Sequence, residues 1–239
     1  MSFAEWLALR EPADAAARAR DLVEHLPSPD RWVIHDLGAG TGSMGRWLAP
    51  RLPGPQHWVL HDRDAELLEI ADIPAVTIET RQSDLTRLNL SGATLVTASA
   101  LLDLLTQDEV TALVAACVDA GCPALLTLSV TGRVELTPAH PFDSRVEAAF
   151  DAHQRRGDLL GPEAPAFVAE EFRRAGAEVI ARPSPWRLGA AQAGLMAAWF
   201  DGWLAAAREQ DAEMDVGVCE NRPLDAVTVD HTDLLALPR

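Results

Sequence analysis

Short apolar runs rich in β-branched residues recur along the chain and alternate with longer segments of helical periodicity. Runs of the first kind predict strands, whereas apolar residues at three- and four-residue spacing predict helices that cover a sheet. Because helical segments separate many of the strands, the pattern predicts an α/β protein with a mostly parallel sheet and helices on both faces. The seven expected strands are 32–37, 57–62, 75–80, 93–99, 124–130, 177–183 and 226–231.

Several helical segments carry signals for where they begin and end. In one of them, Thr106 and Glu109 have the spacing of a capping box, and Gly121 stands where a left-handed residue ends a helix. Another helix is expected to start with Pro141 at its first position and to stop at Gly157. Two further helices are expected over 162–176 and 188–210.

No repeat, low-complexity tract or long linker divides the 239 residues, so the sequence predicts a single domain over 1–239. Residues 1–30 are expected to form a helical cap ahead of the first strand. Residues 131–176 and 184–225 are expected to be helical insertions on the substrate side of the sheet.

Charge and composition narrow the range of partners. The chain has 20 Lys and Arg against 36 Asp and Glu, which disfavours nucleic acid because phosphate binding depends on basic side chains. No apolar run is long enough to cross a bilayer, and the N-terminus lacks the pattern of a secretory signal. Three cysteines without C-x-x-C spacing are typical of reduced thiols. We therefore expect a cytoplasmic protein, a monomer or homodimer, with no membrane partner.

Four glycines stand within eight residues directly after the first expected strand, in the segment VIHDLGAGTGSMG. Glycine at this density lets backbone approach a ligand closely. A Walker loop would need a lysine, and none is present. Gly40, Gly42 and Gly45 do fit the dinucleotide fingerprint G-x-G-x-x-G. The glycine motif alone therefore leaves more than one nucleotide ligand open.

Register and charge decide between these ligands. The glycine that directly follows the strand is Gly38, and counted from it the third position of the fingerprint, residue 43, is not glycine. Asp36 stands at the end of the same strand, where its carboxylate would repel a pyrophosphate and attract an ammonium or a sulfonium. These residues favour S-adenosylmethionine over a dinucleotide.

The segment HDLGAGTG resembles motif I of the class I S-adenosylmethionine-dependent methyltransferases, and further landmarks of that family follow in order over about residues 30–130. The resemblance implies a Rossmann-like, doubly wound sheet of seven strands with the seventh antiparallel. It also implies S-adenosylmethionine as cofactor and S-adenosylhomocysteine (SAH) as product. Asp36 would then face the amino-acid part, Asp62 the ribose and Asp84 the adenine, although Asp62 also suits a strand-end cap and Asp84 a turn. The implied cofactor-binding residues are Asp36, Gly38, Ala39, Gly40, Gly42, Asp62, Arg63, Asp84, Leu85 and Ser99.

The methyl acceptor is narrowed mainly by features that the sequence lacks. The fourth strand is followed by ALLDLL and not by the Asn/Asp-Pro-Pro-aromatic signature with which family members grip planar amides and adenine amino groups. There is no tyrosine to act as a phenolic base, and no Cys/His cluster indicates a metal site. The expected acceptor is an oxygen or nitrogen of a small-molecule metabolite.

Two residues are the candidates for acid–base chemistry. Asp103 follows the fourth strand, and His153 falls on the apolar stripe of the helix expected from Pro141. Each also has a structural interpretation, as a solvated helix-start acid and as a satisfied buried histidine. The expected substrate-binding residues are His140, Gln154, Trp186 and Arg187.

Some forty residues separate the sixth and seventh expected strands, whereas the family plan has a short connection there. The long helix in this segment suits either a cap over the substrate pocket or a dimer face. Two other classes of function also stay open: a protein or RNA methyltransferase, and a non-catalytic module that binds the cofactor in order to interact with a partner.

Overall fold

The computed structural model describes residues 1–84, 88–219 and 222–238, so the predicted cofactor contact Leu85 lies outside the described residues. Eight strands belong to one sheet. Their bounds are β1 (Trp32–Leu37), β2 (Gln56–Asp62), β3 (Thr77–Gln82), β4 (Leu95–Ser99), β5 (Ala124–Thr137), β6 (Glu178–Pro183), β7 (Trp186–Leu188) and β8 (Ala226–Leu237).

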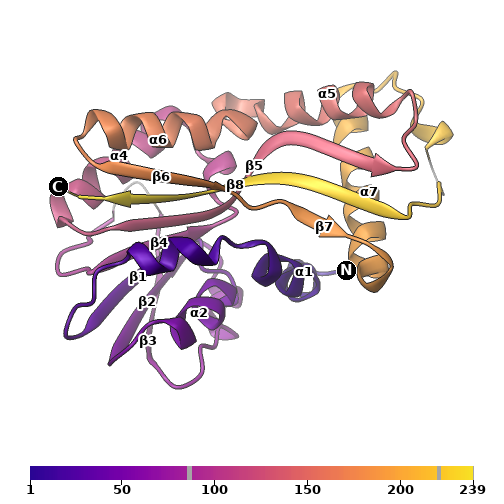
Figure 1. The fold of residues 1–239 in the computed structure, drawn as a ribbon. Helices are drawn as coiled ribbons and strands as arrows, with labels where there is room; N and C mark the ends of the chain where they lie inside the picture. The colour runs from indigo at the N-terminus through magenta and orange to yellow at the C-terminus, as the bar shows by residue number, and fades with distance from the viewer. Residues whose placement is uncertain (85–87, 220–221, 239) are drawn as a thin grey trace.

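The strands follow the order β3-β2-β1-β4-β5-β8-β6, and β7 pairs with β8 beside this path (Figure 1). The first five strands in this order, β3, β2, β1, β4 and β5, pair in parallel with their neighbours. β8 is antiparallel to β5, β6 and β7. The predicted parallel sheet with an antiparallel last strand is confirmed. The short strand β7 is an addition to the seven expected strands.

The longer helices are α1 (Phe3–Ala17), α2 (Ser43–Leu48), α3 (Ala65–Glu69), α4 (Gln107–Ala120), α5 (Asp143–Gln154), α6 (Ala164–Arg174) and α7 (Ala193–Gln210). Short 3-10 turns join them; those used below are η1 (Arg20–His25) and η4 (Leu102–Leu104). In the described part of the chain, no helix is long and apolar enough to cross a membrane.

The capping signals of α4 are confirmed, because Thr106 and Glu109 form the reciprocal capping box and Gly121 has a φ of 65°. The expected start of α5 is wrong. Pro141 lies in a turn in which the Asp143 carboxylate accepts a hydrogen bond from the His140 N–H at 2.7 Å, and the helix begins only at Asp143.

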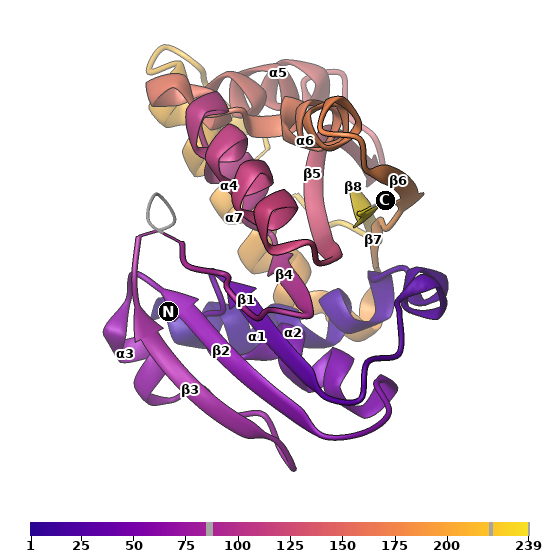
Figure 2. The same ribbon diagram turned by 90° about the vertical axis from the view of Figure 1, so that its left-hand side faces the viewer.

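Helices cover both faces of the sheet, as two of the apolar clusters of the core show (Figure 2). Successive residues of a strand point to opposite faces. Accordingly Leu126 packs with the residues of α4 and α6, whereas Leu125 packs with those of η1 and α2. On β8, Leu234 and Leu235 are divided between the two clusters in the same way.

β5 and β8 extend well past the other strands, and α5, α7 and β7 pack around this extension in a third apolar cluster (Figure 1). Residues 131–137 are therefore strand, and their expectation as part of a helical insertion is wrong. The register of β5 shifts between Leu126 and Ser129, where Leu128 has a φ of 57°. The buried Asp233 carboxylate holds this bulge by accepting the Leu128 N–H at 2.7 Å and the Ala19 N–H at 2.8 Å.

Candidate functional site

A cavity of about 280 Å³ lies at the carboxyl ends of the first strands, where open parallel sheets bind ligands. It brings together Asp36 from the end of β1, Asp62 from the end of β2, Asp84 after β3 and Ser99 from the end of β4. Gly42 does not line it and is the N-terminal cap of α2. Of the other expected cofactor residues, Gly38, Ala39, Gly40 and Arg63 line the cavity.

The glycine loop is shaped by positive φ angles and by close neighbours. Gly38 and Gly40 have φ angles of 63° and 53°, which side-chain-bearing residues rarely adopt. A Cβ at Gly38 would lie 3.0 Å from a methyl carbon of Leu101. The Asp62 carboxylate accepts a hydrogen bond from the Gly40 N–H at 2.8 Å, so the acid at the end of β2 helps to hold the conformation of the loop after β1.

Asp36 is almost fully buried, with 1% of its surface exposed, and lines this cavity. One carboxylate oxygen accepts a hydrogen bond from the Thr97 hydroxyl at 2.7 Å, and the other has no partner among the described residues. Burial raises the pKa of Asp36 to about 7, against the lowering effects of the Thr97 hydrogen bond and of Arg18. An unpaired buried carboxylate oxygen is unfavourable, and a cationic group of a ligand would relieve it.

The side chains around this cavity carry more negative than positive charge. Such a lining opposes a pyrophosphate and suits a ligand that carries an ammonium and a sulfonium. The acidic lining residues are Asp14, Asp36, Asp62, Asp84 and Glu109, and the basic ones are Arg10 and Arg63.

A second cavity, of about 460 Å³, adjoins the first. Among the residues that line both cavities are Phe3 and Arg10 of α1 and Leu104 of η4. The walls of the second cavity are mainly aromatic and aliphatic, and Trp199 stacks on Trp203 of the same helix with ring centroids 5.6 Å apart. Its tryptophans are Trp6, Trp186, Trp199 and Trp203, and its polar lining side chains are Arg10, Asp103, Gln154 and His231.

α1 forms part of both cavities and is held against β7 by side-chain contacts. The Trp186 indole N–H donates to the buried Asp14 carboxylate at 2.9 Å, and Arg10 forms an ion pair with the same carboxylate at 3.0 Å. The Arg10 guanidinium also lies 4.9 Å from the Trp186 ring centroid. Sequence reasoning assigned no site residue to α1; the available signal was an Arg and an Asp four residues apart in the expected N-terminal helix.

Two ionisable side chains in the second cavity are strongly buried. Asp103 is 7% exposed, burial raises its pKa, and the Gln154 amide lies 3.5 Å from its carboxylate. His231 on β8 is 4% exposed, and burial, followed by the charge of Arg10, lowers its pKa to about 3. Its Nδ1 has no hydrogen-bond partner among the described residues. The sequence predicted Asp103, Gln154 and Trp186 as site residues but not His231.

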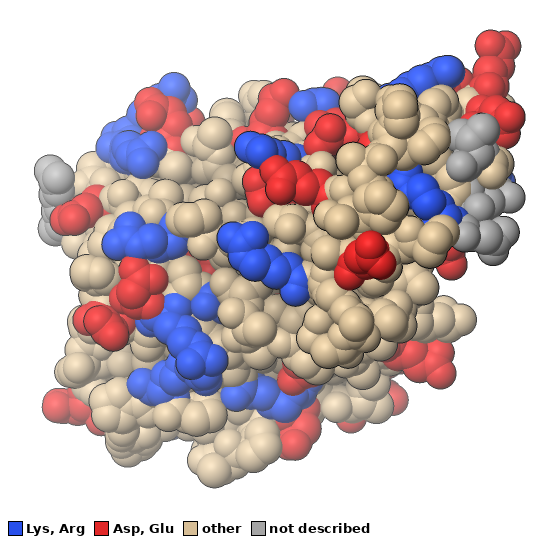
Figure 3. All heavy atoms as spheres, turned by 45° about the vertical axis from the view of Figure 1, so that its right-hand side comes forward, with Lys and Arg blue, Asp and Glu red and all other residues tan. Residues whose placement is uncertain are grey.

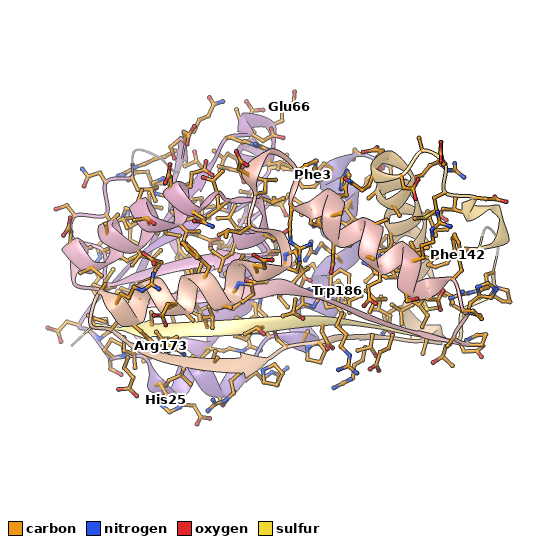
Figure 4. All side chains as sticks on the ribbon, turned by 90° about the horizontal axis from the view of Figure 1, so that it is seen from above. Phe3, His25, Glu66, Phe142, Arg173 and Trp186 are labelled. Carbon is orange, nitrogen blue, oxygen red and sulfur yellow. The ribbon has the colours of Figure 1, made fainter. Side chains whose placement is uncertain are left out.

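Three other predicted site residues line neither cavity. His153 pairs with Glu209 of α7 at 3.0 Å. Arg187 is exposed on β7, and His140 lies before α5. In Figure 4, Phe3 and Trp186, which line the second cavity, lie toward the middle of the molecule. Phe142, two residues after His140, lies near one end.

The sequence indicated no Cys/His cluster, but the fold brings His140, Asp143 and Cys219 together with candidate ligand atoms within 4.8 Å of one another. The Arg222 guanidinium, however, bonds both Asp143 oxygens, at 2.6 and 3.2 Å. A guanidinium so placed competes with a metal ion for the carboxylate, so this group is an ion pair with neighbours and not an open ligand set.

No protein-family model and no curated protein matches the chain. Solved structures do match. The cyclopropane synthase MmaA2 from Mycobacterium tuberculosis is 12% identical with a TM-score of 0.60, over 99% of this chain and 94% of that chain. The mycolic acid cyclopropane synthase CmaA1, complexed with SAH and CTAB, is 12% identical with a TM-score of 0.53, over 94% and 82%. A possible exported protein from Bordetella parapertussis is 16% identical with a TM-score of 0.52, over 96% and 68%.

At such low identity these likenesses establish the fold and nothing finer. The fold is the Rossmann-like fold of class I methyltransferases, which the resemblance of the glycine motif implied.

Proposed function

We propose that the chain is an S-adenosylmethionine-dependent methyltransferase that acts on an oxygen or nitrogen of a small molecule. The observation that carries the proposal is Asp36, a buried carboxylate with one unpaired oxygen in a cavity whose lining is acidic. The cofactor's cationic amino-acid part fits that oxygen, and a pyrophosphate does not. The SAH complex of the structural neighbour CmaA1 supports the same ligand class.

Three of the five acids that line the first cavity are proposed to have separate binding roles. Asp36 would hold the amino-acid part of the cofactor, Asp62 the ribose hydroxyls and Asp84 the adenine amino group. Since Asp62 also bonds the Gly40 N–H, ribose binding and the shape of the glycine loop are coupled. When bound, the cofactor supplies an electrophilic methyl group on its sulfonium.

The second cavity is proposed to hold the acceptor, because it adjoins the first and shares lining residues with it. Its volume lies within the usual range of small-molecule sites. The apolar walls would exclude water from the reacting atoms, and the geometry of the cavity would align the acceptor. Asp103, with its raised pKa, would take the acceptor's proton where the acceptor has one to lose.

A nucleic-acid substrate is disfavoured by the charge of the chain, which is −16. On the face drawn in Figure 3, acidic and basic side chains are interspersed.

Calorimetry tests the cofactor assignment. SAH should bind with micromolar-class affinity and NAD should give no heat of binding. Tight binding of NAD without binding of SAH would reject the proposal. Methyl-donor turnover with a panel of small acceptors then separates an enzyme from a module that only binds the cofactor, and Asp103→Asn should lower turnover while SAH affinity stays unchanged.

A further inference from the structure

The second cavity combines extensive aromatic walls with few charged side chains. Tryptophans from three separate elements, α1, β7 and α7, contribute to it, so a bound molecule is flanked by indole rings from several directions. Its charged lining side chains are Arg10 and Asp103, which have opposite signs. Aromatic walls of this kind favour flat apolar ligands, and a lining with few charged side chains favours uncharged ones.

His231 supplies the polar feature that distinguishes this cavity. It is 4% exposed, and its ring lies 5.4 Å from the ring of Trp186, centroid to centroid. Its Nδ1 has no partner among the described residues, although buried polar atoms are usually hydrogen-bonded. Burial and the nearby positive charge of Arg10 lower the pKa of His231 to about 3, against the raising effect of the Val229 backbone, so the imidazole is neutral. A neutral imidazole has one nitrogen that accepts a hydrogen bond, and a hydroxyl group is a donor of matching size.

Resting on the function proposed above, we infer that the second cavity takes, as methyl acceptor, an uncharged flat aromatic molecule whose hydroxyl group donates a hydrogen bond to His231.

A cationic aromatic ligand is the main alternative, because tryptophan rings also attract cations. Arg10 opposes that alternative. Its guanidinium, which is paired with Asp14, already lies over the Trp186 ring at 4.9 Å, so that ring face is not free for a second cation. Asp103 disfavours an aromatic carboxylate.

The test compares 2-naphthol with 2-methoxynaphthalene, which keeps the ring system but has no hydroxyl hydrogen to donate. Equilibrium dialysis against the full chain saturated with SAH should show that 2-naphthol binds about tenfold more tightly, the usual scale of one neutral hydrogen bond. His231→Phe should weaken 2-naphthol about tenfold and leave 2-methoxynaphthalene unchanged. His231→Asn, which keeps an acceptor, should restore part of the difference.

His153→Phe is the matched control, because His153 lies outside both cavities and pairs with Glu209. It should leave the affinities of both naphthalenes unchanged. Phenyltrimethylammonium serves as the cationic probe and should bind more weakly than 2-naphthol.

Three results would overturn the inference: equal wild-type affinity for the two naphthalenes, an equal loss of both in His231→Phe, or tighter binding of phenyltrimethylammonium. The comparison of the two ligands on the unmutated chain remains decisive if His231→Phe fails to fold. SAH binding is measured separately. If SAH does not bind, the methyltransferase proposal is refuted, and dialysis of the naphthalenes without SAH still tests the second cavity. If SAH binds but 2-naphthol does not, only the inferred class of acceptor is refuted.

Discussion

Replacing Asp36 by asparagine should change the pH dependence of stability and the affinity for SAH in ways that can be separated. In the folded chain the pKa of Asp36 is about 7, against 3.8 for an exposed aspartate. A group whose folded pKa is raised contributes its stability below the unfolded pKa and loses it as pH rises through the folded pKa. Asp36 therefore destabilises the fold progressively between about pH 4 and pH 7.

The magnitude follows from the shift, which is about three pKa units at about 1.4 kcal/mol each, or about 4 kcal/mol at most. The substituted asparagine would remain neutral at every pH, and its oxygen would still accept the hydrogen bond of the Thr97 hydroxyl. Its amide N–H groups, however, would replace the unpaired carboxylate oxygen and lack an acceptor, which costs about 1–3 kcal/mol. Asp36→Asn should thus stabilise the ligand-free chain by about 1–3 kcal/mol at pH 8 and destabilise it at pH 4.

Urea unfolding of both chains at pH 4, 6 and 8 checks this sign change, since titrations elsewhere in the molecule cancel in the difference between them. Calorimetry at pH 8 should show SAH binding about 10–100-fold more weakly to the variant, because a charge-assisted hydrogen bond to the cofactor's ammonium is lost. A stability difference that is the same at pH 4 and pH 8 would contradict the assigned burial of a charge. Unchanged SAH affinity would contradict the binding role.

Asp62→Ala should weaken SAH binding by about 1–3 kcal/mol, since it removes the proposed ribose contact and the acceptor of the Gly40 N–H; Asp62→Asn should lose less, and equal affinities by calorimetry would refute the contact. His35 and His61 contact each other at 3.0 Å, and burial lowers both pKa values to about 4, so their contribution to stability is complete above about pH 6.5 and is lost as pH falls toward 4. His35→Phe should reduce this fall in the unfolding free energy between pH 6.5 and pH 4, as measured by urea unfolding at several pH values. An unchanged pH dependence would refute the assignment to the histidine pair. Asp233→Ala should lower the unfolding free energy by about 3 kcal/mol or more, because it leaves the Leu128 N–H of the β5 bulge, the Ala19 N–H and the Ser184 hydroxyl without this acceptor; a loss below about 1 kcal/mol would refute that role.

The first cavity was largely predictable from the sequence for a simple physical reason. The carboxyl ends of parallel strands lie at one edge of a sheet, so acids at or just after the ends of successive strands must gather there. Asp36, Asp62 and Asp84 do so, and the glycine motif indicated which ligand their charge suits. Local signals were also enough for α4, whose start and end depend only on residues within the helix.

The second cavity was less predictable because its walls depend on contacts between distant parts of the chain. His231 is brought beside Trp186 only by the pairing of β7 with β8. One local signal was present: Val130, Gly132, Val134 and Leu136 alternate with longer polar residues, as expected for a strand that extends past residue 130. The glycine in this run interrupts the apolar alternation, and the sequence analysis therefore predicts an insertion and not a strand after residue 130.

One helix, α1, contributes to the walls of both cavities. α1 presents Phe3 and Arg10 to both of them, and it is held by contacts at several points along its length. Glu11 forms an ion pair with Arg46 beside the glycine loop, whereas Asp14 accepts the indole N–H of Trp186 beside the acceptor cavity. Substitutions that remove these contacts would therefore alter the walls of both cavities at once. Because methyl transfer needs donor and acceptor to be aligned and shielded together, a wall common to both cavities suits the proposed function.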